Sequence, residues 1–449
     1  MENIVVIGGN AAGLTAASRA KRIDPRLHVI VLEKLPQIAY STCGLPYLLA
    51  KLVTADQLIS YTPEKFEQER GIKVFNFVQV NAIVPGRKRV EAIRVDTGEK
   101  MEFGFDRLLL AAGVKPRIPS IPGTGLKNVF SVLSLQDALR IQGPLAAASN
   151  VVIVGAGYAG LEYAESLRAL GKAVVLLERE PHVLSSVDPD MAQIIEFELR
   201  RFGVQVFTSA KVLALVGQDG IVNGVKAATS LGIIPADLVL LDTGVEPNVD
   251  LTRDTNIRIG ATGGIAVDDH LETNIPGVYA AGNCAETFCR IRRRPVLSAI
   301  GTVAAKQGRI AGENLAGRRS KFVGSIGTTV LKVFELAVAR TGLTSREASA
   351  ERITFVSARI EADDRASYYP GSRKVWVKLI VDRESRKLIG AQAAGYGEVS
   401  KRIDVAAAAI SGGMTIDDVA QLDLAYSPPY GNLWDPLLVA AQAVIRRIH

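Results

Sequence analysis

Short apolar runs, each ending at a glycine, recur along this chain of 449 residues. Residues 4–7 lead into Gly8, and residues 151–154 lead into Gly155. Each glycine is followed by a segment rich in small residues and then by a second apolar run. Uninterrupted apolar strands that alternate with helical segments are typical of parallel sheets with both faces covered. The pattern therefore predicts two copies of one strand–turn–helix–strand unit within an α/β fold.

The second copy contains the pattern G-x-G-x-x-G as Gly155, Gly157 and Gly160. In this pattern the first glycine forms the tight turn, the second admits a pyrophosphate, and the third lets the helix pack closely on the strand. Glu178 ends the next apolar strand, at a position where an acid binds ribose hydroxyls. The second copy is therefore predicted to bind a dinucleotide.

The first copy is less regular, because Asn10 stands between Gly8 and Gly13 where a middle glycine is expected. Asparagine adopts positive φ more readily than most residues, although its side chain crowds the side of the turn that faces the phosphates. Glu33 ends the following strand, so the turn, helix and acid are all kept. We expect two bound dinucleotides, with one site and one relic as the alternative.

Two further apolar strands each run into Gly-Val-x-Pro, at residues 113–116 and 244–247. They predict paired crossovers between two nested Rossmann-like domains. We place the first domain at 1–113 and 247–322, the inserted domain at 114–246, and a C-terminal α+β domain at 323–449. Helices are expected at 301–317, 344–350 and 402–412.

Composition and charge narrow the function classes. A share of 48% hydrophobic and 22% charged residues is that of an ordinary globular α/β protein. The net charge of +7 gathers in clusters such as 19–22 and 290–294, but no helix-turn-helix or base-stacking pattern favours nucleic acid. A phosphorylated small thiol remains a candidate ligand for the basic residues. For the arginines at 290–294 we have no account.

The three cysteines, Cys43, Cys284 and Cys289, are too few for a disulfide framework and indicate a reducing cytoplasm. No run of eighteen apolar residues and no signal-peptide pattern occurs, so neither a membrane span nor secretion is expected. No metal site is predicted.

Taken together, these segments resemble the flavin- and pyridine-nucleotide-dependent disulfide reductase family over essentially the whole chain. The resemblance implies FAD in the first unit, NADH or NADPH in the second, and a C-terminal dimerisation domain. Members of the family contact the ribityl chain of FAD with an Asp, and at that position this sequence has Asn283. Ala111-Ala112-Gly113 replaces the Ala-Thr-Gly of the family. We expect weaker FAD binding, not its loss.

The resemblance assigns to FAD the residues Gly8, Asn10, Ala11, Ala12, Gly13, Glu33, Lys34, Cys43, Ala111, Ala112, Gly113, Gly282, Asn283, Gly301, Thr302 and Ala304. It assigns to NAD(P)H the residues Gly155, Gly157, Tyr158, Ala159, Gly160, Glu178, Arg179 and Gly244. Glu178 favours NADH because its charge repels a 2′-phosphate. Arg179 could instead receive that phosphate, or lie solvated, so NADPH stays an alternative.

The stretch YSTCGLPY around Cys43 holds a single thiol, because Leu48 stands where a C-x4-C pair would place the second. It resembles the single-cysteine branch of the family, which comprises coenzyme A-disulfide reductases, persulfide and sulfur reductases, and NADH oxidases and peroxidases. Such a thiol can form a mixed disulfide or cycle through a sulfenic acid. A helix beginning after Gly44 would lower its pKa; a buried, inert cysteine is the alternative.

The proton donor separates these two chemistries. Oxidases and peroxidases of the branch carry a histidine in the first glycine turn, where this chain has Ala11. Tyr426 and Tyr368 match positions that coenzyme A-disulfide reductases place in the partner subunit's active site, with interface packing as the alternative. The resemblance implies a homodimer with shared active sites, and it implies substrate contacts from Arg19, Arg22, Ser41 and Tyr430.

The sequence therefore predicts an FAD-dependent NAD(P)H:disulfide oxidoreductase that works through a mixed disulfide on Cys43. Coenzyme A disulfide is the leading substrate, with coenzyme A as a thiol that could stay bound. The alternatives are a persulfide or polysulfide reductase, an NADH oxidase or peroxidase, and a redox-sensing flavoprotein without turnover.

Overall fold

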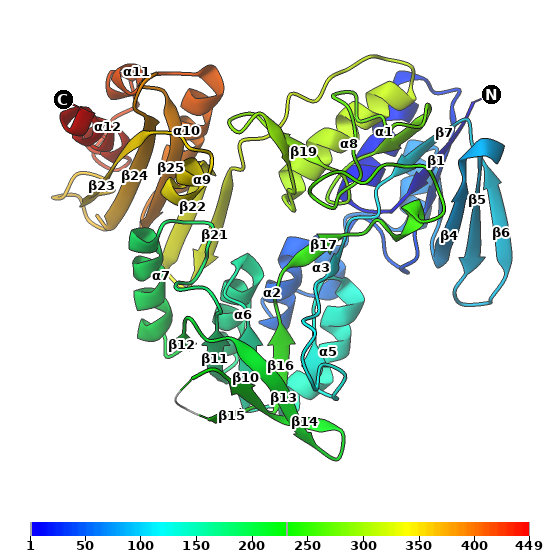
Figure 1. The fold of residues 1–449 in the computed structure, drawn as a ribbon, viewed down its shortest axis with the longest axis horizontal. Helices are drawn as coiled ribbons and strands as arrows, with labels where there is room; N and C mark the ends of the chain where they lie inside the picture. Colours follow the sequence, from blue (N-terminus) through cyan, green and yellow to red (C-terminus); the bar gives the residue numbers. More distant parts are fainter. Residues whose placement is uncertain (1, 230–231, 449) are drawn as a thin grey trace. The chain divides into compact units, whose positions relative to one another are not determined.

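The computed structural model describes residues 2–229 and 232–448. The chain forms two compact units (Figure 1). Unit 1 comprises Met1–Arg117, Leu133–Leu135 and Val245–Ser325, and unit 2 comprises Ile118–Val132, Gln136–Gly244 and Ile326–His449.

The centre of unit 1 is a parallel five-stranded sheet in the order β18-β7-β1-β2-β3. Its strands are β1 (Asn3–Ile7), β2 (His28–Leu32), β3 (Lys73–Phe75), β7 (Arg107–Leu110) and β18 (Val278–Ala280). Helices α1 (Ala11–Ile23) and α8 (Gly301–Leu315) lie side by side (Figure 1). Small residues permit this, since a Cβ on Gly308 would lie 2.4 Å from the carbonyl oxygen of Ala12.

Short elements complete unit 1. They are η1 (Thr42–Gly44), α2 (Leu45–Leu49), α3 (Ala55–Leu58), α4 (Pro63–Arg70), the antiparallel sheet β4 (Val78–Val84), β5 (Arg89–Arg94) and β6 (Lys100–Gly104), η2 (Pro85–Arg87), η3 (Asp250–Thr252), and the hairpin β19 (Thr287–Cys289) and β20 (Arg294–Val296). The predicted crossovers do pair, as β8 (Val114–Pro116) and β17 (Val245–Pro247) run antiparallel with Lys115 opposite Glu246.

Unit 2 repeats the first architecture with a parallel sheet in the order β12-β11-β10-β16-β9. Its strands are β9 (Val129–Phe130), β10 (Asn150–Val154), β11 (Ala173–Leu177), β12 (Gln205–Phe207) and β16 (Leu238–Leu241). With it are α5 (Leu135–Ala147), α6 (Tyr158–Ala169), α7 (Pro189–Arg201), and the antiparallel strands β13 (Val212–Gln218), β14 (Ile221–Ala227) and β15 (Ile233–Pro235). The repeat predicted from sequence is therefore a repeat of structure.

The C-terminal part of unit 2 is an antiparallel sheet in the order β21-β22-β25-β24-β23. Its elements are β21 (Thr329–Val333), β22 (Leu336–Gly342), α9 (Ser345–Ala350), β23 (Phe355–Asp363), β24 (Lys374–Asp382), β25 (Leu388–Gly395), α10 (Ser400–Gly412), α11 (Ile416–Ala420) and α12 (Pro436–Ile448). Helices α8, α9 and α10 match the predicted helices to within two residues; α11 and α12 were not predicted. Apolar residues of α10 and α12 share one core with the sheet.

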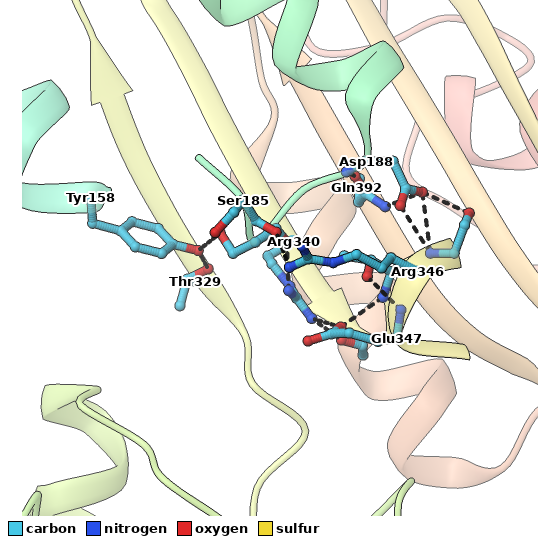
Figure 2. Close-up of polar contacts among 12 residues, drawn as sticks. Tyr158, Ser185, Asp188, Thr329, Arg340, Arg346, Glu347 and Gln392 are labelled. Carbon is cyan, nitrogen blue, oxygen red and sulfur yellow. Dashed lines mark hydrogen bonds and ion pairs between the residues drawn. The ribbon is translucent and has the colours of Figure 1, made fainter. Parts of the chain in front are cut away.

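Within unit 2 a buried polar network joins the segment before α7 to the C-terminal sheet (Figure 2). Asp188, which precedes α7, is 1% exposed. Its carboxylate accepts hydrogen bonds from Gln392 (2.8 Å) and Ser345 (2.7 Å) and pairs with Lys378 (2.9 Å). Burial acts to raise the pKa of Asp188, but these partners hold the pKa below its ordinary value.

The observed architecture confirms the predicted fold class of two Rossmann-like sheets and a C-terminal α+β domain. The three predicted domain boundaries remain predictions. Among the described residues, the structure contains no helix long and apolar enough to cross a membrane.

Candidate functional site

The first glycine turn is shaped by close backbone approaches. Gly8 has φ +114°, and a Cβ there would lie 2.3 Å from the carbonyl oxygen of Ala111, which follows the neighbouring strand β7. A Cβ on Gly13 would lie 2.0 Å from the carbonyl oxygen of Gly8. Any side chain at either position would push the turn off the sheet, so the turn requires these two glycines.

Glu33 stabilises this turn from the end of β2. Its Oε2 accepts a hydrogen bond from the amide of Gly9 at 2.7 Å, and its Oε1 accepts one from the amide of Leu35 at 2.8 Å. Burial raises the pKa of Glu33, and the hydrogen bonds from the two amides partly oppose this rise. The predicted ribose-binding acid is therefore also a structural brace of the glycine turn.

Two buried oxygens near the carboxyl end of this sheet are unsatisfied. The Oδ1 of Asn283, just after β18, and the Oγ of Ser298, just before α8, have no hydrogen-bond partner among the described residues. Native proteins rarely leave such atoms unsatisfied. Polar groups of a flavin can supply the missing bonds, so the residues present fit FAD. Asn283 was predicted to contact FAD and Ser298 was not; a serine shortly before a helix N-terminus was the available signal.

Cys43 lies on the 3₁₀ turn η1, directly before α2, and is exposed. The next residue, Gly44, packs directly on Leu58 and holds the turn in place, because a Cβ on Gly44 would lie 2.3 Å from Cδ2 of Leu58. Upstream, the amide of Ala39 donates to the carbonyl oxygen of Gly9 at 2.9 Å, which ties the cysteine loop to the first glycine turn. Cys43 is therefore not buried, against the alternative of a buried cysteine, and its reactivity remains a prediction.

The other two cysteines are buried. Burial raises the pKa of the Cys284 thiol to about 11, so that thiol stays protonated near neutral pH. Exposure thus distinguishes Cys43 from both other thiols of the chain.

A cavity of about 660 Å³ opens between α1 and the cysteine loop. Its lining includes Ala11, Arg19, Arg22, Ser41, Arg70 and Arg309. The structure therefore brings three predicted substrate residues, Arg19, Arg22 and Ser41, into the lining of one cavity. Cys43 is not among the lining residues and follows Ser41 by two positions in the chain. Arg70 and Arg309 were missed by sequence reasoning, because they lie far from Arg19 and Arg22 in the chain.

The arginines of this cavity differ in their partners. Arg19 pairs with Glu313, with 2.9 Å between Nε and Oε1, and Arg309 approaches the same oxygen at 3.5 Å. Arg70 donates to the Tyr61 hydroxyl at 2.9 Å, whereas its Nε is buried without an acceptor among residues 2–229 and 232–448. The positive charge of these arginines makes the cavity suited to an anionic ligand.

The second glycine turn repeats the first. Gly155 has φ +109°, and a Cβ there would lie 1.9 Å from the carbonyl oxygen of Asp242 after β16. The Oε2 of Glu178 accepts from the amide of Ala156 at 2.7 Å. Gly157, the N-cap of α6, offers no side-chain cap of its own, and a helix N-terminus of this kind is a typical binding place for a pyrophosphate. These residues fit a dinucleotide.

Tyr158, the first residue of α6, points toward the C-terminal sheet. Its hydroxyl lies 2.7 Å from Oγ1 of Thr329 on β21 and accepts a hydrogen bond from Ser186 at 3.2 Å (Figure 2). Arg179 has a side chain that is 75% exposed and lies 3.3 Å from Glu180. Both alternatives for Arg179, phosphate contact and simple solvation, therefore stay open.

The predicted tyrosines lie in unit 2 and are all exposed: Tyr368 at 75%, Tyr430 at 72% and Tyr426 at 47%. Tyr368 and Tyr426 are neighbours, and desolvation together with the Tyr426 hydroxyl raises the pKa of Tyr368. Such exposed aromatic side chains are suited to contact with a partner molecule.

The remaining predicted cofactor residues differ in exposure. Those that are buried or half-buried lie in the two turns, in α8 and after strands β7 and β18, namely Ala12, Gly13, Ala112, Gly113, Ala159, Gly282 and Ala304. Those that are exposed are Lys34, Gly244, Gly301 and Thr302. The contacts of both groups with FAD or NAD(P)H remain predictions.

A family model described as pyridine nucleotide-disulphide oxidoreductase matches residues 2–308, and the dimerisation domain of that family matches residues 328–436. The chain belongs to this family. The NAD(P)H coenzyme A polysulfide/persulfide reductase of Pyrococcus horikoshii is 38% identical over 99% of this chain and 98% of its own length. A protein of Methanocaldococcus jannaschii named NADH oxidase is 34% identical over 99% of both chains. The solved structure of an NAD-dependent persulfide reductase from A. fulgidus is similar at a TM-score of 0.96, with 38% identity over 99% of this chain and 83% of that one.

Membership of the pyridine nucleotide-disulphide oxidoreductase family confirms the predicted enzyme class. The protein is a flavin-dependent oxidoreductase that uses NAD(P)H, and its C-terminal domain is the family's dimerisation domain. A redox-sensing flavoprotein without turnover is accordingly not favoured.

Proposed function

We propose that this oxidoreductase reduces a sulfur–sulfur bond carried by coenzyme A, with Cys43 as the nucleophile. The observation that carries the proposal is an exposed Cys43 that follows, by two residues, Ser41 in the lining of a cavity that also contains Arg19, Arg22, Arg70 and Arg309. A ligand that fills the cavity and reaches Cys43 must be long, anionic at one end and sulfur-bearing at the other.

Coenzyme A has this chemistry. Its phosphate groups would lie against the arginines, which bind phosphate through charge-assisted hydrogen bonds. Tyr61 and Phe66, whose rings meet edge to face at 5.5 Å, also line the cavity and offer an aromatic surface to an adenine. Arg70, which donates to the Tyr61 hydroxyl, adds a further positive charge to the lining of the cavity.

The reaction follows from these residues. The Cys43 thiolate attacks one sulfur of the substrate, forms a mixed disulfide and releases the first product as a thiolate. We assign protonation of that thiolate to Tyr426, supplied by the partner subunit of a homodimer, because a phenol is an acid at neutral pH. When bound, FAD supplies the relay of two electrons from NAD(P)H. Those electrons, with a second proton, release the second thiol and restore the Cys43 thiolate.

Cys43 and the arginines of the cavity make coenzyme A disulfide the leading substrate. A coenzyme A persulfide or polysulfide is the second candidate, favoured by the name of the P. horikoshii relative. Both need the same cysteine and the same anionic cavity and differ only in the leaving group.

An NADH oxidase is a third candidate, since the M. jannaschii relative carries that name. Against it, Ala11 lines the cavity at the position where oxidases and peroxidases of the branch have a histidine. A methyl group can neither donate nor accept the proton that reduction of a peroxide bond requires.

The test is steady-state NADH consumption with coenzyme A disulfide, coenzyme A persulfide, peroxide and oxygen as acceptors, for wild type and Cys43→Ser. We expect the variant to keep FAD and its reduction by NADH but to lose disulfide and persulfide turnover by about 10³-fold or more. Cys289→Ser, at a buried thiol, is the matched control and should keep turnover. Tyr426→Phe should slow turnover by about 10²–10⁴-fold without affecting flavin reduction. Disulfide turnover that survives in Cys43→Ser would refute the proposal, and oxygen as the fastest acceptor would favour the oxidase.

A further inference from the structure

Asp242 is a half-buried acid at the second glycine turn for which the reaction above has no use. It follows β16 directly, and its Oδ2 accepts a hydrogen bond from the amide of Gly160 at 2.7 Å. Gly160 is the third residue of α6, so its amide has no partner within the helix. Since the N-cap residue Gly157 has no side chain, Asp242 caps α6 from a neighbouring strand.

The matching position in unit 1 carries no such group. The carbonyl oxygen of Ala111 lies against Gly8 just as that of Asp242 lies against Gly155, at 2.3 and 1.9 Å from where a Cβ on the glycine would stand. The two residues are thus equivalent in the two repeats. One turn has a methyl group where the other has a carboxylate.

The N-terminus of α6 is also where the dinucleotide pyrophosphate must bind. It presents free amides and the positive end of the helix dipole, which together favour one anion. Asp242 already supplies an anion there. A pyrophosphate arriving at the same end of α6 therefore meets a like charge and finds one first-turn amide engaged.

Other acids surround Asp242. Glu178 faces it from the end of β11, and Glu162 and Tyr163 face it from α6. Burial and the Glu178 charge raise the pKa of Asp242 to about 6, against the lowering effect of the Gly160 amide. Burial and the charges of Glu165 and Asp242 raise the pKa of Glu162 to about 7. Burial, Asp242 and Glu162 raise the pKa of Tyr163.

We propose that Asp242 sets the affinity for NAD(P)H by competing, as a carboxylate, with the pyrophosphate for the N-terminus of α6, and that binding takes up a proton on Asp242. A protonated Asp242 keeps its carbonyl oxygen on Gly160 but no longer repels the ligand. The proposal concerns NAD(P)H, which follows from family membership, and does not depend on the sulfur substrate.

The pH dependence has a definite sign. Above about pH 6 the free protein holds Asp242 ionised, and the bound anion raises the pKa of Asp242 further. Between the free and bound values each binding event takes up as much as one proton, so affinity rises by up to about tenfold for each unit by which the pH falls. Below about pH 6 the affinity levels off.

Isothermal titration calorimetry of the holoenzyme with NAD⁺ tests this, because NAD⁺ binds without reducing the flavin. Titrations between pH 5.5 and 8, each in two buffers of different ionisation enthalpy, give both Kd and the protons taken up. For wild type at pH 7.5 we expect measurable proton uptake. For Asp242→Asn we expect uptake to fall, NAD⁺ to bind about tenfold more tightly at pH 8, and wild type and variant to converge near pH 5.5.

Two controls separate Asp242 from its neighbours. Glu162→Gln removes the other acid that titrates near neutrality and should leave most of the proton uptake and the pH slope of affinity. Adenosine, which lacks the pyrophosphate, should bind without proton uptake. If Asp242→Asn does not fold, Asp242→Ala reproduces the residue found at Ala111 and should act in the same direction.

Absence of proton uptake by wild type would overturn the proposal without any variant. So would unchanged affinity and uptake in a folded Asp242→Asn, or loss of the uptake in Glu162→Gln alone. Failure of the coenzyme A proposal would leave all these results as they stand.

Discussion

The two Rossmann-like sheets of this chain invite comparison because their turns are built from the same parts. Glu33 braces Gly9 and Glu178 braces Ala156, in both cases at 2.7 Å. The first glycine of each turn has a φ above +100° and packs on the carbonyl of the residue that follows a neighbouring strand. At that residue the likeness ends, since unit 1 has Ala111 and unit 2 has Asp242.

The difference matches what the two cofactors have to do. We assign FAD to unit 1, where it must stay bound through every turnover, and NAD(P)H to unit 2, where it must leave after each hydride transfer. An anion at the pyrophosphate site lowers affinity and therefore favours release. Two copies of one motif can thus retain one dinucleotide and exchange another through a single side chain.

The largest effect is expected from alanine at the first glycine of each turn. Gly8→Ala and Gly155→Ala each place a Cβ within 2.3 Å of a carbonyl oxygen at a positive φ, a conformation that costs about 1–3 kcal/mol even without the clash. Gly8→Ala should lose FAD from the purified protein, seen by its visible absorbance. Gly155→Ala should keep FAD but lose NAD⁺ binding in calorimetry.

Gly157→Ala controls for the backbone strain and clash in this pair, but not for cofactor binding, because Gly157 is itself predicted to contact the pyrophosphate. A Cβ there would meet Asp242 Oδ2 at an ordinary 3.5 Å, and its φ of −79° suits any residue. Its thermal stability should equal that of wild type. If Gly155→Ala lost FAD and Gly8→Ala kept it, the assignment of cofactors to the two turns would be reversed.

The repeat itself could be predicted from sequence, and the reason is local. A buried parallel strand needs an apolar run, and the turn after it needs glycine wherever the backbone passes within about 2–3 Å of its neighbour. Gly8, Gly155, Glu33 and Glu178 were therefore found from their order alone. Aligning the two later strands, residues 107–113 with 238–244, would also have exposed the contrast between Ala111 and Asp242, but the acid carries no motif of its own.

The substrate cavity was harder to predict because it is built from distant segments. Arg19 and Arg22 lie on α1, Arg70 ends α4 and Arg309 lies on α8, so they meet only in three dimensions. Glu313, which pairs with Arg19, has no sequence signal at all. Helices α11 and α12 were missed although both carry start signals in the sequence. These are the capping box of Thr415 with Asp418, and Asp435 directly before Pro436.

Transplanting the acid gives an intermediate effect. Ala111→Asp introduces into unit 1 the charge that unit 2 already has. Two unit charges about 6 Å apart at a partly exposed site repel by about 2–3 kcal/mol, so FAD should dissociate about 10–100-fold more readily. Fluorescence of released FAD during dilution measures this. Ala111→Asn, of the same size without the charge, is the control; equal loss of FAD from both variants would point to crowding instead of charge.

The smallest effect concerns the choice between NADH and NADPH. Glu178 ends β11 with Oε2 on the amide of Ala156 and Oε1 on that of Glu180 at 2.9 Å, so its charge stays fixed at the turn. A 2′-phosphate placed beside it would be repelled. Glu178→Gln keeps an amide acceptor and removes the charge, and we expect the ratio of kcat/KM for NADH over NADPH to fall by about 3–10-fold. Glu33→Gln, the same change in the other turn, should leave that ratio unchanged.

Arg179→Ala tests the other candidate for cofactor choice. Because Arg179 is exposed beside Glu180, its loss should barely change NADPH use. A wild-type preference for NADPH that disappears in Arg179→Ala would show that the arginine, and not the acid, decides which cofactor this turn selects.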